Sequence, residues 1–433
     1  MRKLILFTMV LLICGGMLFA GGGRQGSSEA TGQTTIRWAF WGNETRIQLT
    51  QQAIEEFMRL NPSIKVNIEP TGGTVDMFTR VDTQLAGGAG PDIIQMGTNF
   101  PDYVNRNVIL ELEPLGSSGR GLINTSVIDQ SALEAATLNG HLWGISTGAN
   151  YEAFLVNKTM LEKAGAPLPK MAHTWEEFRA YLMQIKPLLP AGVYPIGDLG
   201  WTGGGARLFE YWARWYGQTP YVRSTNSTEL TPEACRIYLE MWQDYRNNGL
   251  IPPPEVAAAY PNTGPDHTSD FVVGKAAITL LTSNMLSSYM GVMEDELMLI
   301  QMPGINAATK PLETRLSQVM TINRASRNID DAAKLIDFMT NSPIPARLLG
   351  SNRGSPNSST YRAAMPSNPI DDVINAYIGV VAPFSTKERD LVPNDAERSS
   401  TGYLIYQGVY FGDLTPAQGG REIYDMYVRL INK

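Results

Sequence analysis

The sequence contains very few cysteines and histidines. Its only cysteines are Cys14 and Cys235, and Cys14 lies in a segment that we expect to be removed, so no intramolecular disulfide is expected in the mature chain. Cys235 stands among aliphatic residues of a predicted helix and is interpreted as a small buried hydrophobic residue. The histidines His141, His173 and His267 are far apart and lack metal-ligand spacing. The sequence therefore predicts no disulfide framework, no metal site and no cofactor.

Runs of basic residues are also absent. The chain has 35 Lys and Arg against 42 Asp and Glu, which gives a net charge of −7. Phosphate binding needs clustered Lys and Arg, so this balance argues against nucleic acid as a partner. Hydrophobic residues make up 43% and charged residues 18% of the chain, which is ordinary for a globular protein. The 433 residues are enough for two domains with sizeable cores.

Catalytic signatures are missing too. The sequence has no G-x-S-x-G nucleophile elbow, no H-E-x-x-H pair and no P-loop. A glycosidase needs two carboxylates flanking the scissile bond, and among 42 acids some will lie near any cleft. We therefore interpret the chain as a binding protein and not as an enzyme.

After residue 20 no apolar run is long enough to span a bilayer. Two basic residues at 2–3, an apolar run at 4–18 and a small-residue site ending at Ala20 indicate that residues 1–20 are an export signal peptide. We expect the mature protein to be periplasmic or otherwise extracytoplasmic. A short membrane anchor is the alternative interpretation.

The segment 11–14, Leu-Leu-Ile-Cys, loosely resembles a lipoprotein box. In that case the chain would be lipid-anchored through Cys14. The residue before such a cysteine is normally small and Ile13 is not, so cleavage after Ala20 is favoured. Residues 21–33 are rich in Gly and Ser and predict a flexible tether.

The most informative stretch runs from residue 78 to residue 115. A helical apolar stripe ends on the glycine-rich run 87–91, and the short apolar strand 92–96 follows. In an open parallel sheet, ligands bind outside the carboxyl ends of the strands. Thr98 and Asn99, directly after this strand, are therefore expected to face a ligand.

The opening of the chain alternates strands and helices. Residues 35–40 and 64–68 have strand patterns, and an amphipathic helix between them stops at Asn61-Pro62. With the strand at 92–96, this order predicts a doubly wound α/β sheet.

Several motifs occur in a fixed order along the chain. They are F-x-x-x-x-P-x-I-x-V at 57–66, A-G-G-x-G-P-D-I at 86–93, K-A-G-x-P at 163–167, T-W-E-E-F at 174–178 and F-x-x-G-x-A-A-I at 271–278. Together they resemble the extracellular solute-binding protein family 1, the sugar-binding proteins of ABC importers that are maltose-binding-protein-like. The chain departs from the family pattern at Ser146, where proline is usual, and at Val156, where tyrosine is usual.

The resemblance implies a two-lobed periplasmic-binding-protein fold (type II). Each α/β lobe is a sheet flanked by helices, and a multi-segment hinge joins the lobes. We expect residues 34–149 and 316–345 to form lobe 1, and residues 150–315 and 346–433 to form lobe 2.

A sugar offers C–H faces to aromatic rings and a rim of hydroxyls to planar polar groups. In lobe 1 the loop tips that match this chemistry carry Trp41, Asn43, Glu44, Gly72 and Asn99, with Thr98 beside the last. The rival interpretation of Trp41 is a core residue.

The hinge and lobe 2 add further candidates. The resemblance places ligand contacts at Asn150, Asn284 and Arg353, and the glycine-rich segment after Trp201, with Gly203, opens a helix. Free amides at that helix start could also bind an anion. Arg353 as a plain surface cation remains an alternative.

The sequence therefore predicts a monomeric solute-binding component of an ABC importer that carries a sugar or oligosaccharide to the membrane permease subunits. A ligand-sensing module coupled to a receptor is the alternative. The solute could also be a polyamine, a polyol or a phosphorylated compound.

Overall fold

The computed structural model describes residues 33–97, 99–201, 206–261, 264–387 and 395–432. The predicted signal peptide, with Cys14, and all but the last residue of the predicted tether lie outside these ranges. Among the described residues, no helix is both long and apolar enough to cross a bilayer.

Two hydrophobic cores confirm the two-lobed α/β architecture. Lobe 1 is built from β1 (Thr34–Trp41), α1 (Glu44–Leu60), β2 (Ile64–Thr71), α2 (Thr74–Ala86), β3 (Ile93–Met96), α3 (Phe100–Asn105), η1 (Glu113–Leu115), η2 (Thr125–Val127), α4 (Gln130–Ala135), β4 (Thr137–Leu138), β5 (His141–Leu142), β6 (Ile145–Ser146), β12 (Val319–Ile322), α11 (Ile329–Asn341), α12 (Pro343–Leu349) and α13 (Ser359–Ala364).

Lobe 2 packs helices around a smaller sheet. Its elements are β8 (Glu152–Asn157), α5 (Lys158–Lys163), α6 (Trp175–Ile185), η3 (Lys186–Leu188), α7 (Arg207–Trp215), η4 (Arg223–Thr225), α8 (Pro232–Asn247), α9 (Pro254–Ala259), β9 (Ile278–Thr282), η5 (Ser283–Met285), α10 (Leu286–Val292), β10 (Leu297–Ile300), α14 (Pro369–Val381), η6 (Ala382–Phe384), α15 (Asp395–Phe411) and α16 (Pro416–Ile431).

The sheet of lobe 1 has the order β2-β1-β3-β12-β6. Strands β1, β2 and β3 are parallel, as the alternation of strands and helices predicted, and β12 pairs antiparallel with both β3 and β6. The expectation that the strand at 319–322 returns to lobe 1 is confirmed. Because β1 has a neighbouring strand on each side, its inward side chains Ile36, Trp38 and Phe40 are fully buried.

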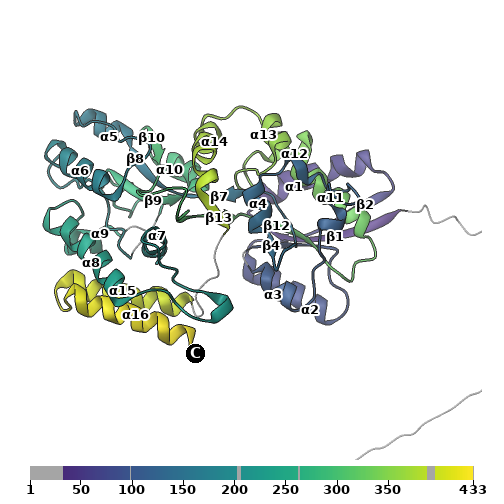
Figure 1. Cartoon of the computed structure of the whole chain (residues 1–433). Coiled ribbons are helices and arrows are strands. Elements are labelled where there is room, and N and C mark those ends of the chain that lie inside the picture. Colours follow the sequence, from purple (N-terminus) through teal and green to yellow (C-terminus); the bar gives the residue numbers. More distant parts are fainter. Residues whose placement is uncertain (1–32, 98, 202–205, 262–263, 388–394, 433) are drawn as a thin grey trace, which may run out of the picture.

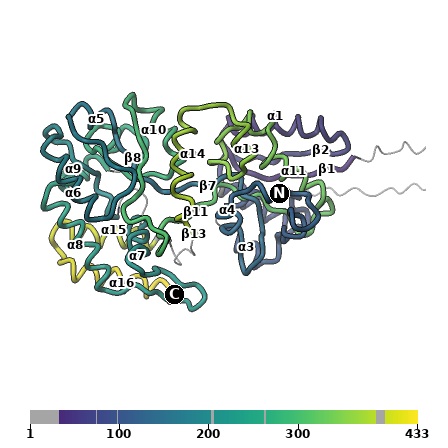
Figure 2. The backbone as a smooth tube through the Cα atoms, turned by 45° about the horizontal axis from the view of Figure 1, so that its top comes forward, coloured from purple at the N-terminus to yellow at the C-terminus, as the bar shows by residue number. Residues whose placement is uncertain are grey.

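A third sheet, β13-β11-β7, lies between the lobes. It consists of β7 (Ala149–Asn150), β11 (Leu312–Leu316) and β13 (Ser385–Lys387). Figures 1 and 2 show these segments side by side at the junction, with β1 in one lobe and α16 in the other. Several connecting strands restrict bending to one axis, whereas a single linker would let the lobes tumble.

Local signals explain where individual elements begin. Thr174 caps α6 and forms a capping box with Glu177. The turn at Asn139-Gly140 has positive φ angles of 56° and 84° and joins β4 to β5, a conformation that Asn and Gly adopt most readily.

The expected end of lobe 1 at residue 345 is wrong. Leu349 belongs to the core of lobe 1, and the Tyr361 hydroxyl on α13 donates to the carbonyl of Pro345 at 3.0 Å. The chain enters the core of lobe 2 only on α14, where Ile374 and Tyr377 are buried. The helices α12 and α13 therefore extend lobe 1 by a segment that the sequence had assigned to lobe 2.

Candidate functional site

A cavity of about 530 Å³ lies between the lobes. Lobe 1 lines it with Asn43, Arg46 and the segment from α12 to Ser355, and lobe 2 with Asn284, two serines of α10 and the start of α14. Its polar lining consists of Asn43, Arg46, Asn284, Ser287, Ser288, Ser317, Arg347, Ser351, Asn352, Ser355, Asn368 and Asp371. Two predicted site residues from different lobes thus meet at one cavity.

The end of β1 positions Asn43 and Arg46. The Asn43 side chain caps α1 by accepting from the amide of Arg46 at 2.9 Å. A Cβ on Gly42 would lie 2.9 Å from Cδ of Arg46. Glycine at this position therefore leaves room for the Arg46 side chain beside the end of β1. Glu44, in the first turn of α1, is exposed and accepts from Gln48 at 3.3 Å.

Arg46 was not predicted from the sequence. Its Nε donates to the carbonyl of Asn352 at 3.0 Å and to Oδ1 of the same residue at 3.2 Å. Burial lowers the pKa of Arg46 below its usual value. Among the described hydrogen bonds only Nε is used, so both Nη groups remain for a ligand. The feature of the sequence that could have identified Arg46 is its position three residues after Asn43, which caps α1.

Trp41 and Asn99 come together at the carboxyl ends of β1 and β3. A Cβ on Gly97 would lie 3.7 Å from Oδ1 of Asn99 and 3.9 Å from the Trp41 ring. The half-buried Trp41 ring packs 6.0 Å from the ring of Phe78. Asn99 accepts from the amide of Gly97 at 3.0 Å. Neither residue lines the 530 Å³ cavity, although Trp41 is two residues from Asn43.

The remaining loop predictions in lobe 1 are less informative. Gly72 lies in an exposed bend after β2, with open space where a Cβ would stand. Thr98 lies outside the described residues, and so does Gly203 in lobe 2.

Asn150 lies in the hinge strand β7, opposite Arg315 in β11. It is 7% exposed, and within the described part of the chain its Oδ1 is buried without a hydrogen-bond partner. A buried amide oxygen without a donor is destabilising. A ligand hydroxyl at this position would supply the missing donor.

Trp201 is not a ligand platform. The residue is 2% exposed and stacks on Phe209 at 5.1 Å between ring centroids. On its other side it contacts Gly402 of α15, where a Cβ would approach its ring to 2.1 Å. Trp201 therefore belongs to the core of lobe 2.

Arg353 is neither a ligand contact nor a surface cation. It is 3% exposed in lobe 1, where Nη1 donates to Gln95 and to Gln318 and Nη2 donates to Thr50, each at 2.7 Å. Its guanidinium also lies 4.9 Å from the ring of Trp38. Burial lowers the pKa of Arg353 to about 9.

The loop around Arg353 nevertheless lines the cavity. Gly350 and Gly354 have positive φ angles of 50° and 101°, which glycine tolerates best. By fixing this loop, Arg353 holds Ser351 and Asn352 at the cavity wall. It is a positioning residue.

Two charged residues missed from the sequence complete the cavity. The Ser351 hydroxyl donates to the largely buried carboxylate of Asp371 at the start of α14, and exposed Arg347 stands on α12. Arg46 and Arg347 outnumber the one lining carboxylate, which makes the cavity suited to a polar or anionic solute.

A second cavity, of about 510 Å³, lies between α4 and α14. It is lined by the ion pair of Arg362 with Asp129 at 2.7 Å. None of the predicted site residues lines it, so it is not the candidate site.

Comparison with known proteins matches residues 52–372 to the family described as bacterial extracellular solute-binding protein. Among solved structures, an extracellular solute-binding protein family 1 member from Alicyclobacillus acidocaldarius is 26% identical with a TM-score of 0.81, covering 93% of this chain and 99% of that one.

Two structures with bound or named ligands have the same fold. A periplasmic oligogalacturonide binding protein from Yersinia enterocolitica is 22% identical, with a TM-score of 0.75 and coverage of 92% and 99% of the two chains. An ABC substrate-binding protein from Listeria monocytogenes in complex with cycloalternan is 18% identical, with a TM-score of 0.68 and the same coverage.

Proposed function

Because this chain belongs to the bacterial extracellular solute-binding protein family, we propose that it binds a sugar or oligosaccharide between its lobes and delivers it to an ABC permease. One observation carries the proposal. Asn43 of lobe 1 and Asn284 of lobe 2 line the same polar cavity. Amides, hydroxyls and guanidinium groups are the partners that sugar hydroxyls need.

The mechanism depends on ligand contacts that are divided between the two lobes. A solute that touches both lobes completes its contacts only when they close, so it shifts the population toward the closed form. The strands β7, β11 and β13 would carry that motion. In the closed form Asn150 would donate and accept at the hinge, and Trp41 would offer a ring to a sugar face.

The test is a thermal-shift screen of neutral and acidic mono- and oligosaccharides. A ligand at about 100 times its dissociation constant adds about 2.7 kcal/mol to the stability of the folded state. Asn284→Ala should lose most of this shift, while Gln184→Ala, which removes an exposed amide on α6 of the same lobe, should retain it. A shift produced by another class of polar solute and by no sugar would contradict the proposal.

The excess of arginine favours acidic sugars within this class. Arg46 and Arg347 line the cavity together with a single carboxylate, that of Asp371, and one relative of the same fold is described as binding oligogalacturonide. Arg46→Gln should weaken a uronate oligomer about tenfold or more and a neutral oligomer less. Arg59→Gln, at the far end of α1 in an exposed pair with Glu56, should change neither affinity.

The partner is tested separately from the ligand. Deleting the gene in its host should abolish uptake of the labelled sugar found in the screen. Unchanged uptake together with a lost transcriptional response would favour the sensory module instead. The same cavity argues against a polyamine, because an ammonium ligand would meet two guanidinium groups.

A further inference from the structure

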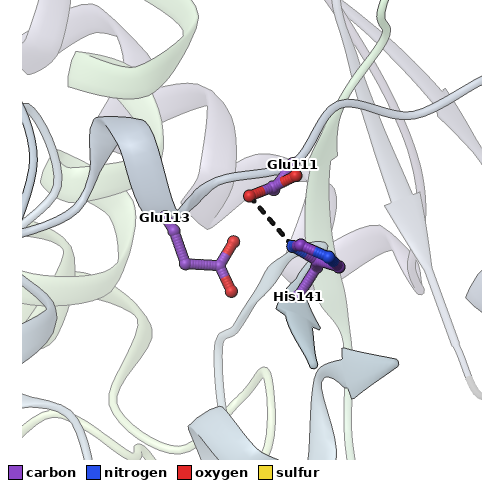
Figure 3. Close-up of side chains that lie close together, drawn as sticks. All are labelled: Glu111, Glu113 and His141. Atoms are coloured by element: carbon purple, nitrogen blue, oxygen red, sulfur yellow. Dashed lines mark ion pairs between the residues drawn. The ribbon is translucent and has the colours of Figure 1, made fainter. Parts of the chain in front are cut away.

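Two glutamates of one short segment and a histidine from a later hairpin converge in lobe 1. Figure 3 shows Glu111, Glu113 and His141 pointing toward a common point. One ligand atom from each residue lies within 4.8 Å of the others. Glu111 precedes η1, Glu113 begins it, and His141 begins β5.

The backbone holds these residues in place. The amide of Leu112 donates to the carbonyl of Leu142 at 2.8 Å, which ties the first segment to the β4–β5 hairpin. The amide of Leu142 in turn donates to Oε1 of Glu113. A carboxylate already oriented by an amide is a typical feature of metal sites, since such support fixes the ligand geometry.

Within the described part of the chain, the second carboxylate oxygen of Glu113 lacks a donor, which favours a cation at this cluster. Among the described residues, Oε2 of Glu113 is buried and has no hydrogen-bond partner. A buried carboxylate oxygen without a donor is costly. In Figure 3 this carboxylate faces His141, whose Nδ1 is 3.1 Å from Oε1 of Glu111.

We propose that Glu111, Glu113 and His141 bind one divalent cation of the zinc class. Imidazole and carboxylate ligands together suit Zn²⁺, and water would complete a four-coordinate shell. The side chains of His141 and Glu111 are 51% and 36% exposed, so the ion has an entry path. The three ligand atoms lie within 4.8 Å of one another, and tetrahedral Zn²⁺ would draw them to about 3.3 Å apart.

This cation would have a structural role. It links the segment after α3 to the hairpin that leads through β6 to the hinge strand β7. None of the three ligands lines the cavity between the lobes. Occupancy of the site should therefore stabilise lobe 1 without changing which solute binds.

The test is calorimetric titration of ZnCl₂ into the untagged mature chain after removal of metals with a chelator. Wild type should bind one Zn²⁺. His141→Ala should weaken binding by about 100-fold or more, because one of three ligands is lost. Glu113→Gln should weaken it similarly while retaining the oxygen that accepts from Leu142.

Matched controls separate this site from weak surface binding. His267→Ala and Glu176→Gln, which change exposed residues elsewhere, should bind Zn²⁺ as wild type does. Co²⁺ should give a visible absorption band that His141→Ala loses. Equal Zn²⁺ affinity in His141→Ala and His267→Ala, or no stoichiometric binding by wild type, would overturn the proposal. Thermal unfolding of each variant in chelator reports whether it is folded.

Discussion

The two lobes differ in the relative direction of their strands. The predicted ligand residues share one sheet edge only in the lobe whose strands are mainly parallel. In lobe 1 the parallel strands β1, β2 and β3 end at one edge of the sheet. Trp41, Asn43 and Asn99 all stand at that edge. In lobe 2, β8 pairs antiparallel with both β9 and β10, so the strand ends do not share an edge.

This difference shows which loops a sequence can assign to a ligand site. The rule that ligands bind at carboxyl ends applies to parallel strands, and the loop that it selected after β1 reaches the cavity, where Asn43 is part of the lining. In lobe 2 the choice rested on the family resemblance for Asn284 and on composition for Trp201. Asn284 lines the cavity, whereas Trp201 is a core residue.

The largest expected change in stability comes from replacing Trp201. Trp201→Ala should lower the free energy of unfolding by about 3–5 kcal/mol, because it opens a cavity against Phe209 and α15. Urea denaturation measures this loss. A loss below about 1 kcal/mol would mean that Trp201 is not tightly packed. It would then not belong to the core of lobe 2, and the difference drawn here between the two lobes would be wrong.

Arg353→Ala should cost about 3 kcal/mol, since it leaves Gln95, Gln318 and Thr50 without their donor in a buried site. Arg59→Ala, in an exposed pair with Glu56, should cost about 0.5 kcal/mol or less. The same denaturation experiment checks both. Equal losses of stability for the two variants would indicate that Arg353 is exposed, as Arg59 is.

Trp41→Ala probes the sheet edge of lobe 1. It should remove most of the roughly 2.7 kcal/mol that a saturating sugar adds, with a smaller loss of stability in the free protein than Trp201→Ala. Thermal shifts with and without the sugar measure both quantities. If the free protein loses as much as in Trp201→Ala, Trp41 is a core residue and the site is elsewhere.

A further effect, which depends on pH, concerns a buried acid of lobe 2. Burial raises the pKa of Asp270 to about 6, so the folded state holds this proton more tightly than the unfolded state. Stability from this group is therefore present at low pH and is lost as pH rises from about 4 to about 6.

Asp270→Asn should remove the loss of stability that accompanies the rise in pH from about 4 to about 6. The variant keeps the oxygen that accepts from the amide of Phe271 at 2.7 Å and should gain up to about 3 kcal/mol at pH 7. Denaturation at pH 4, 6 and 7 measures the slope. An unchanged slope between pH 4 and pH 6 would show that Asp270 is ionised in the folded protein without penalty.

Most of the fold could be predicted because its signals are local. The strands at 35–40, 64–68 and 92–96, the Asn139-Gly140 turn and the capping box at Thr174 each depend on a few adjacent residues. Arg353 could not be placed in this way. Its partner Gln95 is 258 residues away, and a loop arginine gives no local sign that two glutamines and a threonine surround it.

The same limit explains the misplaced boundary of lobe 1 and why the sequence did not suggest the proposed zinc site. The helices α12 and α13 pack against α11 of lobe 1, and nothing in their own sequence states which lobe they cover. Glu111, Glu113 and His141 meet only because the β4–β5 hairpin lies beside the segment after α3. Spacing between histidines, the criterion applied to the sequence, cannot detect a site with one histidine.

Closure of the two lobes around a polar solute can be measured by small-angle X-ray scattering. With the sugar that stabilises the protein most strongly, the radius of gyration should fall on saturation, and Asn284→Ala should not contract under the same conditions. A saturated complex with an unchanged radius of gyration would contradict the account.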